Sequence, residues 1–344
     1  MVDGVTGYVR LQDFSEVTIN ELRAALTKLK GAGMQQLVLD LRDNPGGPLD
    51  QAIHVASCFL KPGEKVVYTR GRIARADEDY AADSSCSGYL DVPMIVLVDR
   101  QSASASEIVS GAIQDHDRGL IVGETTFGKA LVQTVFSING GAGLALTTGR
   151  YYTPSDRLIQ RPWDGSFDEY LTYMYRDQNP TPTHADSQAH ETDSKRKVYA
   201  GGGIEPDHFV VGPVEGYDPT RFSRLLMSRA YFVGFAQRFS RVGDDRPGAK
   251  APANTHKVDA GWKVTDAYVE EFRNYLDSQR VKIDEAAFTK DQAFIRAMIH
   301  FEVDVDLWGI EMARKNLSAV DPQLRAALGL FDESKQLLAT RQKP

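Results

Sequence analysis

The sequence lacks three features that would narrow its class at once: a long apolar run, an excess of positive charge, and a set of cysteines. No apolar stretch in the 344 residues approaches the length of a membrane-spanning helix, so none is predicted. The formal net charge is −7, and no basic stretch is long enough to indicate a nucleic-acid partner. The first residues, 1–4, have neither the charged nor the apolar region of a signal peptide.

The two cysteines are too few for a metal-binding pattern. Cys58 lies in an apolar helical pattern, which favours a buried free thiol. A disulfide with Cys86 is the alternative if the protein belongs to an oxidising compartment. His184 and His190 stand six positions apart in a polar stretch, a spacing too weak to predict a metal site. No metal site is therefore predicted.

Apolar and amphipathic segments alternate over the first 150 residues. Short apolar runs predict buried strands, and the stretches between them predict helices. Thr18 with Glu21, and Ser104 with Glu107, have the spacing of capping boxes at two helix starts. This alternation predicts an α/β core with a largely parallel sheet. The strands are expected at 7–11, 37–41, 65–69, 94–98 and 120–122, and the helices at 18–30, 48–60 and 106–114.

Within this pattern, the segment 96–133 places a serine and a lysine at two special points. Ser104 is expected at a helix start after a buried strand, and Lys129 in a glycine-flanked turn after the next strand. Lysine can activate a serine nucleophile if burial lowers the lysine pKa to roughly 7–8. Backbone N–H groups at a helix start can stabilise an oxyanion. Gln133, four residues after Lys129, could orient the lysine if one turn there is helical.

More ordinary roles remain open for these residues. A serine before a helix is usually an N-cap, and a lysine beside glycines is usually a solvated charge. The turn 43–47, DNPGG, has glycines that allow backbone N–H groups to point at a bound group, but a plain strand-to-helix turn is the commoner explanation. Residue types alone favour the ordinary roles.

The motifs between 101 and 133 resemble those of the C-terminal processing proteases, also called tail-specific proteases. The family pattern is close to GSASASEI, GALQDH and VG..TFGKG.VQ, and this chain reads QSASASEI, GAIQDH and VGETTFGKALVQ. The resemblance maps the family nucleophile to Ser104, its lysine base to Lys129 and its glutamine to Gln133. Ala130 departs from the usual glycine, which puts the turn after Lys129 in doubt but removes no catalytic group.

Three further segments extend the resemblance to about residues 5–212. DLRDNPGG resembles a family segment that supplies one oxyanion N–H, which maps to Gly46 or Gly47 without a choice between them; Ala105 supplies the other. LTTGRYYTPSDR resembles LTTARYYTPSGR, with Asp156 in place of a glycine, and YAGGGIEPDHFVV resembles VYGGGGI.PD.

The resemblance implies a fold like that of the Clp protease/crotonase superfamily and a serine endopeptidase with a Ser104–Lys129 dyad and no cofactor. It implies protein or peptide substrates with accessible C-terminal tails, cleaved near those tails, and an extracytoplasmic, periplasmic location. The family usually begins with a signal peptide and a PDZ domain, so the chain is interpreted as a fragment that lacks both. The alternative is a catalytically idle member that acts as a binding or scaffold protein, and the intact Ser104, Lys129 and Gln133 argue against it.

Two other enzyme classes share part of the pattern. GETTFGKA at 123–130 imitates a P-loop, but Ala130 lacks the hydroxyl that binds magnesium, and the next segment is β-prone where a P-loop needs a helix. A Ser-His-Asp hydrolase needs a histidine base, and His116 would lie about 18 Å from Ser104 at the other end of one helix.

The sequence predicts two parts: a protease core at 1–212, with an exposed loop at 177–197, and a mainly helical accessory region at 213–344. The accessory region is expected to carry no catalytic group and to offer helices for a homo-oligomer. Its helical spacing occurs at 219–241, 265–281, 286–303 and 306–316, with a Pro/Gly-rich linker at 243–257. An aromatic patch, Trp163, Phe167 and Tyr170–Tyr175, is expected in the core or at an interface edge.

Overall fold

The structure, a computed structural model, describes residues 1–72, 77–86, 88–162, 173, 182–212, 219–239 and 256–341. The chain divides into two compact units: Met1–Val210 with Ala326–Pro344, and Val211–Arg325. The predicted linker at 243–257 lies mostly outside the described residues. So does the aromatic patch, apart from Tyr173.

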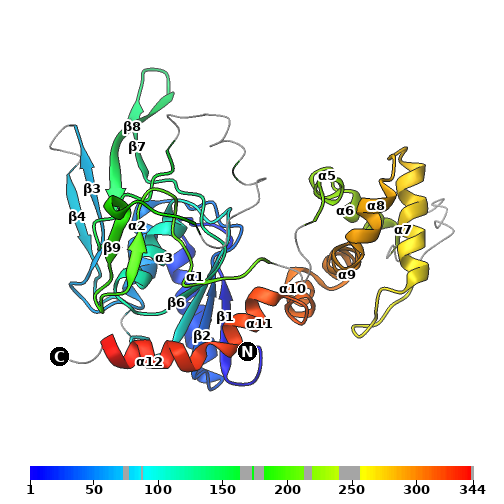
Figure 1. Cartoon of the computed structure of the whole chain (residues 1–344), viewed down its shortest axis with the longest axis horizontal. Coiled ribbons are helices and arrows are strands. Elements are labelled where there is room, and N and C mark those ends of the chain that lie inside the picture. Colours follow the sequence, from blue (N-terminus) through cyan, green and yellow to red (C-terminus); the bar gives the residue numbers. More distant parts are fainter. Residues whose placement is uncertain are drawn as a thin grey trace. The chain divides into compact units, whose positions relative to one another are not determined.

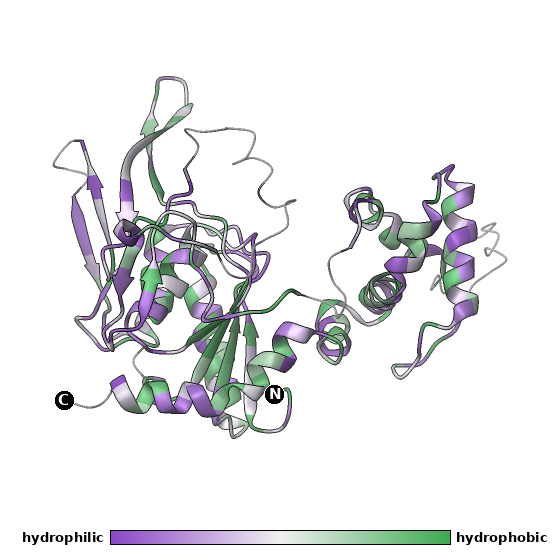
Figure 2. Cartoon of the chain, in the orientation of Figure 1, coloured by the Kyte–Doolittle hydropathy of each residue, from purple (hydrophilic) through white to green (hydrophobic). Residues whose placement is uncertain are grey.

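A five-stranded parallel sheet forms the centre of the first unit (Figure 1). The strand order is β1-β2-β5-β6-β11, and every neighbouring pair is parallel. β5 is buried along its whole length, as expected of a strand inside a parallel sheet, and the central strands are coloured as hydrophobic in Figure 2. Leu39 of β2 lies opposite Val96 of β5, so the two predicted strands share one sheet. The strands are β1 (Thr6–Arg10), β2 (Gln36–Asp40), β5 (Met94–Val98), β6 (Leu120–Gly123) and β11 (His208–Phe209).

The helices of this unit follow the predicted periodicity. α1 buries Leu22, Leu26 and Leu29 on one face. The predicted capping box at Thr18 is wrong, because Thr18 is already helical and its hydroxyl accepts the Ser15 N–H instead, at 2.8 Å. These helices are α1 (Thr18–Gly31), α2 (Leu49–Ser57), α3 (Ala105–Asp115) and α12 (Phe331–Arg341).

α12, the last helix of the chain, packs against the parallel sheet. Phe331, Ser334 and Leu338 are buried on one face of α12, and Ser334 Oγ donates to Met94 O in β5 at 2.9 Å. The compact units therefore differ from the expected division at residue 212, since the end of the chain returns to the first unit. The spacing of these three side chains, three and four residues apart, gives α12 the face that covers the sheet.

A second, antiparallel sheet has the order β4-β3-β8-β7, so β4 and β7 are its edges. The expected exposed loop at 177–197 contains a short helix and most of a small hairpin within its described part. The strands of the sheet are β3 (Lys65–Gly71), β4 (Glu78–Ala81), β7 (Leu131–Ser137) and β8 (Gly143–Tyr152); the short helix is η3 (Asp186–Gln188), and the hairpin pairs β9 (Ala189–Glu191) with β10 (Lys197–Tyr199).

Cys58 and Cys86 form a disulfide, with their Cα atoms 4.3 Å apart. The favoured prediction of a free buried thiol at Cys58 is therefore wrong, and the alternative holds. The apolar pattern around Cys58 predicted its burial, but burial does not distinguish a thiol from a disulfide sulfur. The bond closes a loop with a sequence separation of 28 between its ends.

The second unit is helical and packed around aromatic rings. The Phe232 and Phe272 rings stack with centroids 4.9 Å apart, and Phe235 meets Phe272 edge-on at 5.2 Å. The single helix predicted at 219–241 is broken, because Ala230 adopts a φ of 56° between α5 and α6. The helices are α5 (Arg221–Ser228), α6 (Tyr231–Phe239), α7 (Asp266–Ser278), α8 (Glu285–Lys290), α9 (Gln292–Trp308), α10 (Ile310–Ser318) and α11 (Pro322–Gly329), whose last turn belongs to the first unit.

The predicted fold class is confirmed: an α/β core with a largely parallel sheet precedes a mainly helical C-terminal region. None of the helices in the described ranges is both long and apolar enough to cross a membrane.

Candidate active site

Ser104 occupies the sharp turn between β5 and α3. Its φ of 55° and ψ of −112° lie outside the regions that a residue with a Cβ normally adopts. Such backbone strain persists only where the surroundings hold it in place, and it concentrates at functional sites. The Ser104 side chain is partly exposed, and the Glu107 half of the predicted capping box is present, with the Ser104 N–H donating to Glu107. An N-cap residue normally has an extended backbone, so capping does not explain the positive φ of this serine.

Glu107 holds the backbone of Ser104 next to the backbone of Lys129. Its Oε2 accepts the Ser104 N–H at 2.8 Å and the Lys129 N–H at 2.9 Å. Two N–H groups that share one acceptor oxygen lie within about 6 Å of each other. The other oxygen, Oε1, accepts the Thr126 hydroxyl and the Gly128 N–H, both at 2.6 Å. One carboxylate thus fixes the start of α3 to the turn that carries Lys129.

The Glu107 carboxylate is fully buried. Burial raises its pKa to about 7, because an ion loses its hydration there, although the hydrogen bonds from Thr126, Lys129, Gly128 and Ser104 act in the opposite direction. An ionised carboxylate can accept all four of these donors at once, whereas a protonated one must turn a donor toward one of them. The contacts of Glu107 therefore fit its charged form.

Tyr151 contacts the same two residues through their carbonyl groups. Its hydroxyl, on the largely buried ring at the end of β8, lies 3.2 Å from Ser104 O and also donates to Lys129 O. The backbone N–H groups of Ser104 and Lys129 thus share Glu107, and their carbonyl oxygens share Tyr151. We call Glu107 and Tyr151 the backbone clamp.

The side chains of the expected dyad are not joined. Lys129 is partly exposed, and no hydrogen bond within the described ranges connects its Nζ to Ser104 Oγ. Gln133 lies exposed in β7, so the helical turn that would have placed its amide beside Lys129 does not form. The same strand removes the P-loop alternative, which required a helix after Lys129.

The turn 43–47 is attached directly to the Ser104 turn. Asn44 O accepts the Ala103 N–H and the Ser106 hydroxyl, each at 3.0 Å. A Cβ added at Gly46 would lie 2.7 Å from the Ser104 Cβ and 2.8 Å from the Ala105 N. Only glycine fits between these groups, so the two predicted site features are neighbours.

Some backbone N–H groups of this region already have an acceptor and others do not. The Gly46 N–H donates to Asn44 Oδ1 at 2.9 Å. Among the described residues, the N–H groups of Gly47 and Ala105 have no acceptor. These two N–H groups could therefore donate hydrogen bonds to a ligand oxygen beside Ser104. A Cβ at Gly47 would lie 1.9 Å from Phe14 O, so this position also requires glycine.

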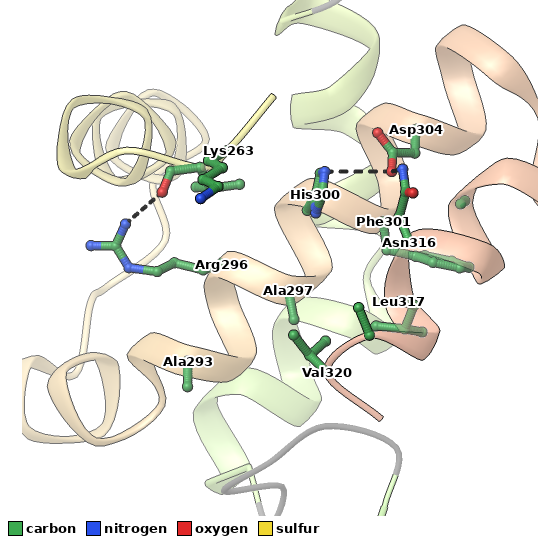
Figure 3. A pocket seen from close by; sticks show the side chains of 13 residues that line it. Lys263, Ala293, Arg296, Ala297, His300, Phe301, Asp304, Asn316, Leu317 and Val320 are labelled. Carbon is green, nitrogen blue, oxygen red and sulfur yellow. Dashed lines mark hydrogen bonds and ion pairs between the residues drawn. The ribbon is translucent and has the colours of Figure 1, made fainter. Parts of the chain in front are cut away.

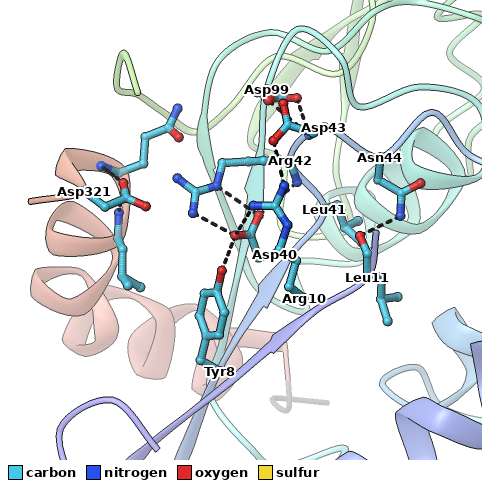
Figure 4. A network of polar contacts seen from close by, with 12 residues as sticks. Tyr8, Arg10, Leu11, Asp40, Leu41, Arg42, Asp43, Asn44, Asp99 and Asp321 are labelled. Atoms are coloured by element: carbon cyan, nitrogen blue, oxygen red, sulfur yellow. Dashed lines mark hydrogen bonds and ion pairs between the residues drawn. The ribbon is translucent and has the colours of Figure 1, made fainter. Parts of the chain in front are cut away.

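A buried ionic network anchors the strand end that precedes this turn (Figure 4). Asp40, at the end of β2, accepts the Tyr8 hydroxyl at 2.5 Å and two hydrogen bonds from the Arg42 guanidinium, at 2.7 and 2.9 Å. Burial opposes ionisation of Asp40, but Arg42 and Arg10 outweigh it and hold the Asp40 pKa well below its usual range. The network fixes β2 where the turn 43–47 begins.

The histidines weighed from the sequence are engaged elsewhere. His116 ends α3, and its Nδ1 and Nε2 face Asp193 Oδ2 at 2.8 Å and Lys65 O at 2.7 Å. His184 pairs with Glu205 and stacks on a tyrosine, while His190 faces Ser155 O. His116 therefore does not contact Ser104, although a Ser-His-Asp site would require a histidine beside the serine.

A separate pocket lies within the helical unit (Figure 3). It has a volume of about 460 Å³ and an apolar lining that includes Ala297, Leu317 and Val320, with Arg296 and His300 beside it. Arg296 donates to Val264 O at 2.9 Å, and His300 lies 3.5 Å from Asp304. None of the predicted site residues lines this pocket.

Comparison with known proteins finds a family match within the first unit. Residues 5–164 match the model of peptidase family S41. The chain is similar to the carboxy-terminal-processing protease of Bartonella bacilliformis, with 46% identity over 164 residues, which cover 46% of this chain and 37% of that protein. It is also similar to the carboxyl-terminal-processing protease of Synechocystis sp., with 42% identity over 155 residues, covering 45% of this chain and 35% of that protein.

A solved structure with the same kind of name resembles this chain. The photosystem II D1 C-terminal processing protease is 40% identical, with 45% of this chain and 39% of that one covered and a TM-score of 0.41. The matched part of this chain thus spans little more than a third of the length of these relatives.

Sequence reasoning missed the backbone clamp. Glu107 was assigned only to a capping box, and Tyr151 only to a resemblance. The capping spacing does predict that Glu107 turns back to the Ser104 N–H. It contains no information about the second N–H that Glu107 accepts, because Lys129 is 22 residues away in the sequence.

Proposed function

We propose that the chain is a serine endopeptidase that uses a Ser104–Lys129 dyad. The observation that carries the proposal is the backbone clamp: Glu107 and Tyr151 each contact both Ser104 and Lys129. A serine and a lysine 25 positions apart have no structural need to share two buried anchors. The match to the model of peptidase family S41, which spans both residues, supports the same conclusion.

In the proposed mechanism, Ser104 Oγ attacks the scissile carbonyl while the neutral Lys129 amine takes the serine proton. Lys129 then returns this proton to the leaving amine, and water completes hydrolysis of the acyl-enzyme in the same way. The lysine side chain has four rotatable bonds, so it can reach the serine by rotation while the clamp keeps both backbones in place. The resemblance also assigns Gln133 the orientation of the lysine; this role stays a prediction, since the Gln133 side chain is exposed in β7.

The oxyanion of the intermediate is proposed to bind the N–H groups of Ala105 and Gly47. Both lack an acceptor among the described residues, whereas the Gly46 N–H already donates to Asn44. This favours Gly47 over Gly46, the two positions between which the sequence made no choice. Gly46 instead provides the space that brings the turn against Ser104.

The substrates are proposed to be proteins or peptides with accessible C-terminal tails, cleaved near those tails; the two relatives are named as carboxyl-terminal-processing proteases, which supports this proposal. An extracytoplasmic, periplasmic location is proposed as well. The Cys58–Cys86 disulfide supports an oxidising compartment, since such bonds are rare where thiols are kept reduced. A homo-oligomer through the helices of the C-terminal region remains a prediction.

The test compares Ser104→Ala, Lys129→Ala and the double variant on an unfolded protein substrate. Each single change should lower turnover by several orders of magnitude, and the double variant should be no worse, because the two groups act as a unit. Lys61→Ala, at an exposed lysine, should cleave normally. Near-normal cleavage by a folded Lys129→Ala variant would rule out the dyad.

A further inference from the structure

β7, which begins two residues after Lys129, is an edge of the antiparallel sheet, and no strand among the described residues pairs with its outer side. Edge strands are normally protected by charged side chains, prolines or short length, because their free backbone groups pair with any other strand. The opposite edge of the same sheet is protected in this way, since β4 carries Glu78 and Asp79. β7 has seven residues, without a charge or a proline.

The whole β7–β8 hairpin continues this pattern. From residue 130 to residue 149 the sequence contains no charged side chain and no histidine. Five of its large apolar side chains are exposed, at 45% to 68% of their surface. Exposed apolar surface of this kind marks an interaction site. These side chains are Val135, Phe136, Ile138, Leu144 and Leu146.

The backbone of β7 presents a specific set of free groups. At the turn of the hairpin, the Ile138 N–H donates to Ala142 O at 2.8 Å. In an antiparallel ladder, residues alternate between facing the partner strand and facing away from it. The N–H and C=O groups of Gln133, Val135 and Ser137 therefore point away from β8, along the outer edge. Another extended polypeptide can form backbone hydrogen bonds with such a row of N–H and C=O groups.

We propose that the outer edge of β7 binds an extended, uncharged segment of the polypeptide substrate as an added strand and leads it to Ser104. The proposal rests on the proposed function. The connection of β7 to Lys129 favours a substrate over other occupants of the edge. Val135 lies six residues after Lys129, about 20 Å along an extended chain, so about six substrate residues would separate the two points.

The pairing of β7 with β8 shifts between Val132 and Gln133, where Thr148 of β8 is the extra residue of a bulge. A bulge bends its own strand, here β8, and increases the local twist of the strand pair. The regular pairing resumes at Gln133, which is where the outward groups begin. The added strand would therefore pair with 133–137 and separate from β7 as it approaches Lys129, where the peptide bond must reach Ser104.

The test measures peptide binding without catalysis, in the full chain carrying Ser104→Ala. The probe is a fluorescein-labelled peptide of about twelve residues, roughly 40 Å when extended, with a centre of Ala, Val and Thr. Val135→Pro removes an outward N–H at a position where an edge strand tolerates proline. It should raise the dissociation constant about tenfold or more, whereas Val135→Thr keeps the N–H and should stay within about twofold.

Two further measurements identify the mode of binding. N-methylation of every second peptide residue should abolish binding in one of the two alternating sets and leave the other set nearly unaffected, because only one set faces β7. Hydrogen exchange should show new protection of the 133–137 amides when the peptide is bound. Equal effects of both methylated sets, or protection confined to other segments, would overturn the proposal.

The remaining outcomes separate this proposal from the proposed function. If the peptide protects β7 but the wild type cleaves nothing, the edge binds peptides and the enzymatic function fails. If the wild type cleaves its substrate and Val135→Pro binds the peptide normally, the edge proposal is wrong but the proposed enzymatic function stands. If Val135→Pro converts a dimer to a monomer without affecting peptide binding, a second copy of the chain occupies the edge and the proposal is wrong.

Discussion

The segments on either side of Lys129 are built in opposite ways. Before it, the turn at 126–128 and the start of α3 are tied together by buried side chains, with Glu107 accepting four hydrogen bonds. After it, the β7–β8 hairpin exposes apolar side chains and an edge that no strand in the described part of the chain pairs with. In the first region, the polar groups form hydrogen bonds inside the molecule. In the second, backbone N–H and C=O groups and apolar side chains can contact another molecule.

This difference has an energetic meaning. The strained backbone of Ser104 can persist only if neighbouring contacts hold it there, and the clamp supplies those contacts. An exposed hairpin adds little to stability, so its surface can be devoted to binding. We infer that the clamp positions the reacting groups and that the hairpin receives the polypeptide. The predictions below test each half of this comparison, beginning with the clamp.

Glu107→Gln should have the largest effect. The amide NH₂ would face two hydrogen-bond donors, so either Ser104 and Lys129 or Thr126 and Gly128 lose their acceptor. We expect kcat/KM to fall about a hundredfold and the free energy of unfolding to fall by about 2–4 kcal/mol, the range for buried groups left unpaired. Denaturant unfolding and proteolysis assays measure the two effects.

The matched control is Glu21→Gln, which changes an exposed glutamate near the start of α1. It should alter neither activity nor stability measurably. A Glu107→Gln variant as active as the wild type would remove the clamp from the account of catalysis, even if the variant were less stable.

The sequence predicted those parts of the site that depend on contacts between residues close together in the chain. The Ser104 turn, the glycine turn and the parallel sheet depend on local patterns and were predicted from them. The clamp depends on Glu107 and Tyr151 reaching residues 22 to 47 positions away, which no local spacing encodes. Gln133 failed as a helical neighbour because β-propensity in 131–136 decides the conformation there. The return of α12 to the sheet likewise depends on a contact across 240 positions.

The second prediction concerns pH. The pKa of Glu107 is about 7 in the folded chain, above its usual 4.5, so the folded state keeps this proton longer than the unfolded state does. The resulting stabilisation is complete below about pH 4.5 and is lost as the pH rises through about 7, to a total of about 3 kcal/mol. Activity should change in the opposite direction, since the ionised carboxylate accepts all four donors.

Unfolding free energies of the wild type and of Glu107→Gln should be compared between pH 4.5 and pH 8. Because glutamine does not titrate, the difference between the two proteins isolates the Glu107 contribution. The wild type should lose stability relative to the variant as the pH rises. A difference that is constant across this range would mean that Glu107 keeps an ordinary pKa.

The third prediction is Tyr151→Phe. It removes one hydroxyl shared by two carbonyl groups and leaves the ring in place, so the loss of stability should be about 1–2 kcal/mol and the loss of activity about tenfold. Tyr152→Phe is the matched control one residue away, at a side chain that stacks on Tyr68 and does not contact the clamp. Equal effects of the two substitutions would show that Tyr151 acts through general packing and not through Ser104 and Lys129.

The smallest effect is expected in the hairpin. Phe136 is 45% exposed at the edge, whereas Phe59 is fully buried in the core of the same unit. Phe136→Ser should change the free energy of unfolding by less than about 0.5 kcal/mol, while Phe59→Ala should cost about 3–5 kcal/mol. Thermal and denaturant unfolding of both variants measure the contrast. If Phe136→Ser proves as destabilising as Phe59→Ala, the hairpin is held by packing like the rest of the unit, and its apolar surface no longer needs a partner to explain it.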